Sequence, residues 1–126
     1  MSGNSAASST NRVRLGSVEE FPEGEGVSVD LEEFPIPLAV FNLGDRFRAL
    51  PDRCPHKGAP LSRTGTTPKT DNPGGTRGKL DPDAGTVACP WHGLEFDLET
   101  GDCPATSYRV QAFDVVVEDG EVLLER

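Results

Sequence analysis

The sequence predicts an all-β domain, and three observations carry that prediction. Short runs rich in β-branched and aromatic residues recur along the chain, and some alternate apolar with polar side chains. Glycine and proline, 14 and 11 of the 126 residues, mark turns between these runs. No stretch carries the apolar periodicity of a long helix. We therefore expect one small domain with a modest core and many turns.

The first half of the chain is expected to begin with a strand at 12–16, where Arg alternates with apolar residues. Ser17 is a candidate helix N-cap because Glu20 follows three residues later, but Pro22 limits a helix to about one turn. Three further strands are expected, at 26–31, 37–43 and 46–51.

The second half combines a polar segment with more strands. Residues 64–85, TGTTPKTDNPGGTRGKLDPDAG, contain almost no apolar side chain, so we expect a long insertion loop, a feature that is usually functional or mobile. Strands at 86–90 and 94–98 and a turn at 99–102 should lead into a hairpin within 108–126. Asp119-Gly120 suits the tight turn of that hairpin.

Composition narrows the class of protein. There is no long apolar run, and residues 1–11 are small and polar, unlike a signal peptide. We interpret 1–11 as a disordered tail and 12–126 as the domain, and we expect a cytoplasmic protein with no membrane partner. The net charge of −9 argues against nucleic acid as a partner.

Two short motifs each place a cysteine beside a histidine at a Pro-bearing bend. In CPHKGAPLS, residues 54–62, Cys54 and His56 are two positions apart; in CPWHGLEF, residues 89–96, Cys89 and His92 are three apart. The chain has two histidines, and both stand in such a motif. These four residues are candidate metal ligands, since two Cys and two His at compact spacings can hold a structural zinc ion.

The paired motifs resemble the two cluster-binding loops of Rieske proteins. The flanking segments PLAVFNLGDRFRAL and VVVEDGEVLL look like the strands that bracket these loops in small Rieske ferredoxins, and the likeness covers residues 12–126. The small subunit of assimilatory nitrite reductases is similar in the same way. The resemblance implies a Rieske-type antiparallel β-sandwich with two cluster-binding loops, separated here by a longer interval than is usual in the family.

The resemblance also implies one [2Fe–2S] cluster per chain, with Cys54 and Cys89 on one iron and His56 and His92 on the other. Two thiolates, two sulfides and two ferric ions sum to zero, so an added electron creates only one negative charge. Neutral imidazoles thereby raise the reduction potential above that of an all-cysteine cluster. Cys103 lies outside both motifs, and we interpret it as a free, partly buried thiol.

Electron transfer is the function that the resemblance implies. The chain would pass single electrons between a reductase and an oxygenase or other acceptor; the alternative is a small redox subunit of a larger oxidoreductase such as an assimilatory nitrite reductase. A terminal oxygenase also needs a mononuclear iron with two more histidines, and none remain. We therefore expect a redox component with no small-molecule substrate of its own rather than a stand-alone catalyst.

Residues 45–63 sum to +3 in an acidic chain, which predicts a docking surface for the redox partner. Its cations are Arg46, Arg48, Arg53, Lys57 and Arg63. In the family, high-potential members carry an extra cysteine in each loop and a serine after the second His-Gly. Ala59, Trp91 and Leu94 stand in those places here, which predicts a low potential.

Overall fold

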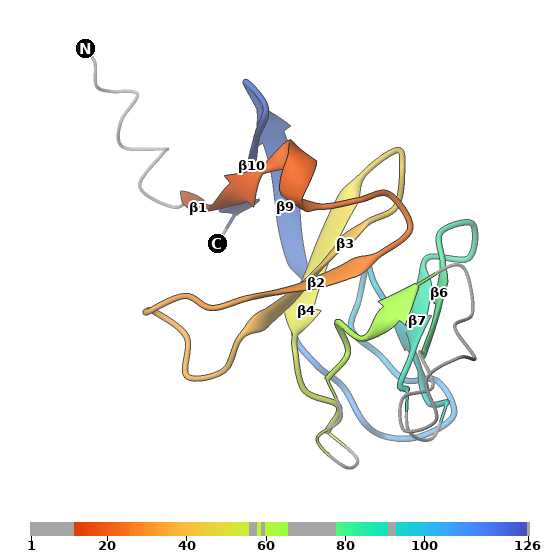
Figure 1. Cartoon of the computed structure of the whole chain (residues 1–126). Coiled ribbons are helices and arrows are strands. Elements are labelled where there is room, and N and C mark those ends of the chain that lie inside the picture. The colour runs from red at the N-terminus through yellow and green to blue at the C-terminus, as the bar shows by residue number, and fades with distance from the viewer. Residues whose placement is uncertain (1–11, 56–57, 59, 66–77, 91–92, 126) are drawn as a thin grey trace, which may run out of the picture.

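Two β-sheets make up the protein, as the expected all-β class requires (Figure 1). The computed structural model describes residues 12–55, 58, 60–65, 78–90 and 93–125. Its larger sheet has six strands in the order β1-β10-β9-β4-β3-β2, all antiparallel. Their bounds are β1 Arg12–Ser17, β2 Gly26–Val29, β3 Leu38–Asn42, β4 Phe47–Pro51, β9 Phe113–Glu118 and β10 Glu121–Glu125.

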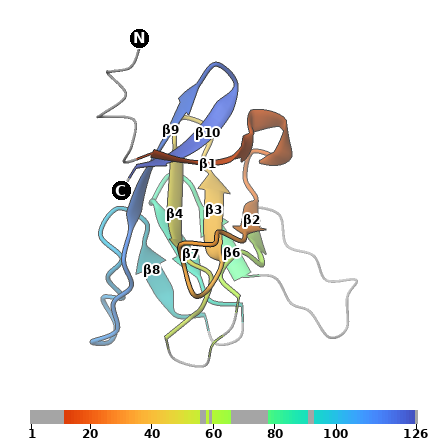
Figure 2. The ribbon, with the colours of Figure 1, turned by 90° about the vertical axis from the view of Figure 1, so that its left-hand side faces the viewer.

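The smaller sheet is inserted in the chain between β4 and β9 and lies to one side of the larger one (Figure 1). Its four strands are β5 Thr64–Gly65, β6 Gly78–Asp81, β7 Thr86–Ala88 and β8 Glu95–Asp97. The short β5–β6 pair is parallel, and the other pairs are antiparallel. Figure 2, turned by 90°, shows β7 and β8 below the long strands β3 and β4.

Strand β3 separates two hydrophobic cores. Ala39 and Phe41 face a core shared with the smaller sheet, whereas Leu38 and Val40 face a core closed by β1 and β10. Because both faces of β3 are covered, its sequence is apolar at four successive positions instead of alternating. The first of these cores also contains all three cysteines, so it joins the larger sheet to the candidate site.

Local predictions for the ends of the chain are confirmed. Residues 18–20 form one turn of 3₁₀ helix, η1 Val18–Glu20, and the Ser17 amide donates to Oε1 of Glu20 at 3.2 Å. The final hairpin turns at Asp119 and Gly120, both in the left-handed region with φ of 53° and 76°, as a tight two-residue turn requires. Residues 1–11 lie outside the described residues.

The expected loop at 64–85 is corrected in part. Thr64–Gly65 and Gly78–Asp81 are strands, and Leu80 is buried in the core. The two inward positions of β6 are Gly78 and Leu80, so this strand has a single apolar side chain on its inward face. One apolar residue in a polar segment is too weak an alternation to predict a strand. Residues 66–77 lie outside the described residues.

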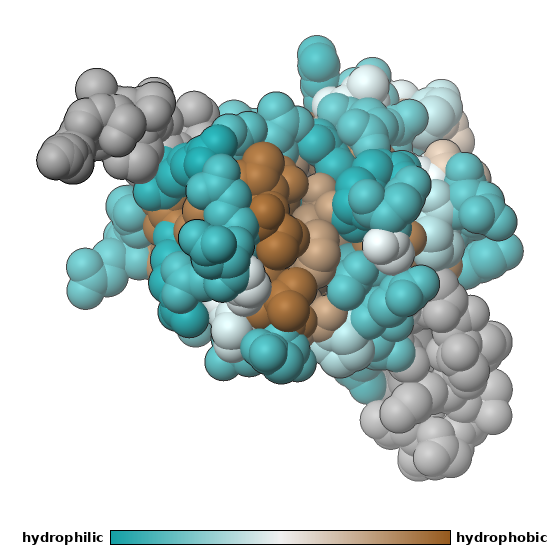
Figure 3. All heavy atoms as spheres, turned by 90° about the horizontal axis from the view of Figure 1, so that it is seen from above, coloured by the Kyte–Doolittle hydropathy of each residue, from teal (hydrophilic) through white to brown (hydrophobic). Residues whose placement is uncertain are grey.

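The surface near Phe47, at the end of β4 opposite to Cys54, is apolar. Seen from above, apolar side chains form a band between polar ones (Figure 3). A shallow hollow there is lined in part by Val18, Phe47, Val115 and Val117. Within the described residues, none of the helical segments has the length and apolar character needed to cross a membrane.

Candidate metal centre

The first candidate loop begins where β4 ends. Cys54 is fully buried, and its carbonyl accepts a hydrogen bond from the Gly58 amide at 2.7 Å. Gly58 has φ of +80°, a conformation that L side chains rarely adopt, so glycine is needed to close this bend. His56, Lys57 and Ala59 lie outside the described residues.

The second candidate loop begins where β7 ends, and it is built in the same way. Cys89 is buried, and its carbonyl accepts from the Gly93 amide at 2.9 Å, again four residues later. Gly93 has φ of +72°, while the Cys89 amide donates to the Leu94 carbonyl at 2.8 Å. Trp91 and His92 lie outside the described residues. Each loop therefore starts with a buried thiol and closes on a left-handed glycine.

The structure brings Cys54 and Cys89 into one hydrophobic core, together with Cys103. None of the three is joined in a disulfide. Cys103, expected to be partly buried, is only 1% exposed, and its amide donates to the Tyr108 carbonyl at 3.1 Å. Sequence reasoning did not predict that Cys103 shares a core with the other two, because Cys103 returns to them only through the turn after β8.

A carboxylate closes the base of the first loop. Asp52 accepts from the Ser62 amide at 2.7 Å and from the Ser62 hydroxyl at 2.8 Å. The Asp52 amide in turn donates to the Pro37 carbonyl at 2.9 Å, which ties the loop to the chain before β3. Ionised acceptors form stronger hydrogen bonds than neutral ones, so this pair fixes where the loop leaves and rejoins the core.

Gly78 joins the two loops, and sequence reasoning missed it. Its amide donates at 3.0 Å to the carbonyl of Arg63, just after the first loop. A Cβ added to Gly78 would stand 2.1 Å from the Ala88 carbonyl oxygen and 3.1 Å from the Pro90 nitrogen, on either side of Cys89. Only glycine lets β6 lie this close to the backbone that carries the second thiol.

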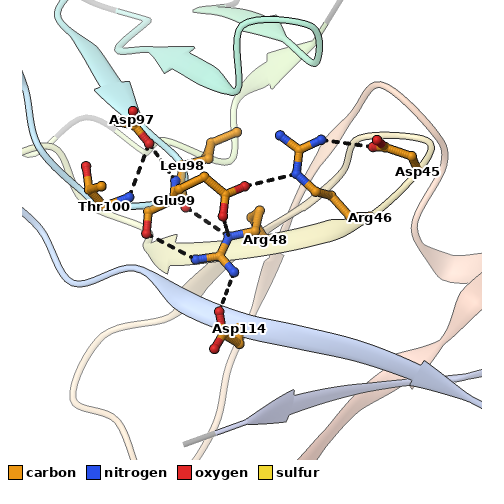
Figure 4. Close-up of polar contacts among 8 residues, drawn as sticks. All are labelled: Asp45, Arg46, Arg48, Asp97, Leu98, Glu99, Thr100 and Asp114. Carbon is orange, nitrogen blue, oxygen red and sulfur yellow. Dashed lines mark hydrogen bonds and ion pairs between the residues drawn. The ribbon is translucent and has the colours of Figure 1, made fainter.

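Arg48 fastens the smaller sheet to the larger one (Figure 4). From β4, its guanidinium donates to the Leu98 carbonyl at 3.0 Å and to Asp114 of β9 at 2.5 Å, and it lies 3.6 Å from Glu99. Only 7% of Arg48 is exposed. Leu98 and Glu99 directly follow β8, the strand after the second loop. The Arg48 side chain therefore holds the end of β8 against β4 and β9 of the larger sheet.

The basic cluster predicted at 45–63 is corrected by these contacts. Arg46 pairs with Glu99 at 2.9 Å and with Asp45 at 2.9 Å. The hydrogen bond to Glu99, followed by the contact with Asp45, raises the pKa of the Arg46 guanidinium. With Arg48 buried as well, neither residue presents a free positive charge to a partner. Arg53 and Arg63 are exposed, and Lys57 lies outside the described residues.

The described residues fit the thiolate half of an iron–sulfur site. Cys54 and Cys89 are buried, are not joined in a disulfide and start loops that bend at glycine. Thiolates are the ligands that iron–sulfur clusters take from proteins, and a buried position shields such a cluster from water. Within the described part of the chain, no group of three or more His, Cys, Asp or Glu gathers to hold a metal ion, and both histidines fall outside it.

Comparison with known proteins points to one family. The family model of the Rieske [2Fe-2S] domain matches residues 11–115. The ferredoxin subunit of 3-phenylpropionate/cinnamic acid dioxygenase from Escherichia coli K12 is 35% identical, over 91% of this chain and 93% of that protein.

Solved structures agree with the family model. A ferredoxin in complex with the oxygenase of carbazole 1,9a-dioxygenase matches with a TM-score of 0.66 and 30% identity, over 91% of this chain and 93% of that one. A nitrite reductase small subunit from Mycobacterium tuberculosis, described as NADH-dependent, matches with a TM-score of 0.69 and 23% identity, over 91% and 94%. The second likeness concerns the fold alone.

Proposed function

The chain belongs to the Rieske [2Fe–2S] family, and from that membership we propose that it carries single electrons from a reductase to an oxygenase or other acceptor. A relative covering nearly the same length is a dioxygenase ferredoxin subunit, and a ferredoxin of similar structure is found with its oxygenase. The observation that carries the proposal is the pair of like-built loops, each opening with a buried thiol of the same core.

The proposed ligands are Cys54 and Cys89 for one iron and His56 and His92 for the other. The burial of both thiols supports the first pair; the sequence motif supports the second. When bound, the cluster supplies reversible uptake of one electron. The chain supplies a rigid, dry setting, because Leu61, Phe96 and the two cysteines are packed in one core that excludes water.

The alternative function is a small redox subunit of a larger oxidoreductase, such as an assimilatory nitrite reductase. The fold supports both readings, since nitrite reductase small subunits share it. The carrier is favoured by the higher identity to dioxygenase ferredoxins. We place this activity in the cytoplasm, where cysteines stay reduced, because none of the three cysteines is joined in a disulfide.

Metal analysis of protein purified without oxygen tests the proposed function. We expect about two irons and two sulfides per chain and the EPR signal of a reduced His-ligated cluster. Recovery of one zinc ion and no sulfide would instead identify a structural zinc site and end the electron-transfer proposal.

Single substitutions test the ligand assignment. Cys54→Ser and Cys89→Ser should each abolish cluster assembly, because a hydroxyl is a poor substitute for a thiolate ligand. Cys103→Ser is the matched control, since Cys103 is equally buried in the same core. It should retain iron, sulfide and the visible spectrum. Loss of the cluster in this control variant alone would mean that the ligands are assigned wrongly.

A further inference from the structure

Most arginines of the described chain are already neutralised by a carboxylate. On β1, Arg12 pairs with Glu118 at 2.6 Å and with Glu125 at 3.1 Å. The other paired arginines are Arg14, Arg46, Arg48 and Arg109. These contacts leave little free positive charge on the larger sheet.

Three exposed cations form no ion pair with a described carboxylate: Arg53, Arg63 and Lys79. They belong to the first loop and to the strand bonded to its end. Arg53 precedes Cys54, and its Nε lies 3.5 Å from the point where a Cβ on Gly58 would stand.

Arg63 and Lys79 lie at the far end of the same loop. Arg63 follows the loop, and its carbonyl accepts from the Gly78 amide. Lys79 directly follows Gly78 and is in register with Gly65 of β5. Lys79 points to solvent, because its neighbours Gly78 and Leu80 are buried. We call Arg53, Arg63 and Lys79 the loop cations.

The charge of the chain is divided sharply along its sequence. Residues 53–79 hold six of the 12 Lys and Arg but one of the 21 Asp and Glu. After the second loop, Glu99 is paired with Arg46 and Asp102 with Arg109, whereas the exposed Glu95 forms no ion pair with a described cation. The unpaired cations among the described residues therefore lie beside the first loop, and the unpaired carboxylate Glu95 follows the second.

We propose that the loop cations dock an acidic surface of the protein that exchanges electrons with this chain. The inference rests on the proposed function, which puts electron exchange at these loops. A local positive field steers and orients an acidic partner even when the net charge of −9 opposes its approach. Glu95, beyond the second loop, repels the same partner, which favours one orientation of approach.

Two small electron acceptors of opposite charge test the sign of this field. One electron passes from the reduced cluster to ferricyanide, giving ferrocyanide, or to hexaammineruthenium(III), giving the ruthenium(II) ion. We measure both rate constants from about 0.1 to 0.5 M salt, where the Debye length of about 10 Å or less lets local charge outweigh net charge. The ferricyanide rate should fall as salt rises. A ferricyanide rate that rises with salt would mean that net charge governs and would overturn the proposal.

Substitutions assign the field to particular residues. Arg53→Gln and Arg63→Gln should each lower the ferricyanide rate at the low-salt end by about two- to threefold. This is the effect expected when one positive charge that attracts a trivalent anion is removed and salt screens part of the attraction. Arg14→Gln is the control, because it removes the same charge from the larger sheet, where Arg14 pairs with Glu121. Equal effects of the three substitutions would overturn the assignment.

An equilibrium measurement separates this inference from the proposed function. Fluorescein-labelled hexaglutamate, followed by anisotropy, should bind the wild-type chain and the Arg14→Gln variant alike and bind Arg63→Gln more weakly, by about two- to threefold. Lack of binding in a chain that does contain the cluster would overturn the docking surface and leave the electron carrier standing. Binding with this pattern by a chain that contains no iron or sulfide would support the docking surface and overturn the electron carrier. Tighter binding of an oligothymidine of equal charge would identify a nucleic-acid site instead.

Discussion

Asp52 holds Ser62 through both of its carboxylate oxygens, one on the Ser62 amide at 2.7 Å and one on its hydroxyl at 2.8 Å. The two residues are ten positions apart in the sequence, and the segment between them contains Cys54. One carboxylate thus sets the width of the first loop at its base, where the chain enters and leaves the core.

Removing this contact should destabilise the loop in two graded steps. Ser62→Ala removes the hydroxyl bond, and we expect it to lower the free energy of unfolding by about 1 kcal/mol. Asp52→Ala removes both bonds and leaves the Ser62 amide without its partner, so about 2–3 kcal/mol should be lost. Urea unfolding gives both values, and cluster release, followed by visible absorbance, should quicken in the same order.

Ser28→Ala is the control for these two variants, since Ser28 is an exposed serine of β2. It should change the free energy of unfolding by no more than about 0.5 kcal/mol. If Asp52→Ala proves no worse than Ser62→Ala, the amide bond does not contribute and the carboxylate does not define the loop.

Gly78→Ala should disturb both loops although its backbone angles are ordinary. The new methyl would stand 2.1 Å from the Ala88 oxygen and 2.7 Å from Cγ2 of Thr64, so β6 must move away from the chain that carries Cys89. We expect a loss of about 1–3 kcal/mol in unfolding free energy and faster cluster release.

Gly93→Ala is the informative comparison for Gly78→Ala. No atom lies within 4 Å of its added methyl, so only the φ of +72° opposes the substitution. That strain should cost about 1 kcal/mol. A Gly78→Ala variant with wild-type stability would show that β6 does not pack against the second loop as described.

The sequence was informative where one residue type carries a local physical signal. Alternation located β1, and Asp119-Gly120 located the last turn because both residues accept positive φ. Cys54 and Cys89 were found because both histidines of the chain stand beside them. The outcome confirms the family and the all-β fold.

The features that sequence reasoning missed depend on contacts between distant segments. Gly78 matters through its distance to Ala88, and Arg48 through Asp114, 66 positions away. No periodicity encodes such pairs. Arg46 and Arg48 were assigned to a docking surface for the same reason, since positive charge is visible in a sequence and its neutralisation by a distant carboxylate is not.

Arg48→Met should weaken the contact between the two sheets and destabilise the protein more than the loss of an exposed ion pair does. The buried guanidinium donates to the Leu98 carbonyl and to Asp114, and methionine replaces its length but not its hydrogen bonds. We expect unfolding free energy to fall by about 2–4 kcal/mol. Arg14→Met, which breaks the exposed pair with Glu121, should cost about 0–1 kcal/mol. Equal losses in chemical denaturation would contradict the role given to Arg48.

The reduction potential should lie in the lower third of the Rieske range, about −150 to 0 mV, and be nearly flat between about pH 6 and 8. Hydrogen bonds to the cluster sulfurs stabilise the added negative charge, and Leu94 has no side-chain donor at the place where high-potential members carry serine. Its side chain packs instead against the core that holds Cys54 and Cys89.

Leu94→Ser supplies the missing hydroxyl and should raise the midpoint by about 30–60 mV, the equivalent of roughly 1 kcal/mol for one electron. Leu94→Ala removes the same apolar bulk without adding a donor, so it measures the effect of water entering beside the loop. The hydrogen-bond argument requires the serine variant to exceed the alanine variant in a redox titration. Equal shifts would assign the effect to hydration, and a wild-type midpoint above about +150 mV would refute the low-potential prediction itself.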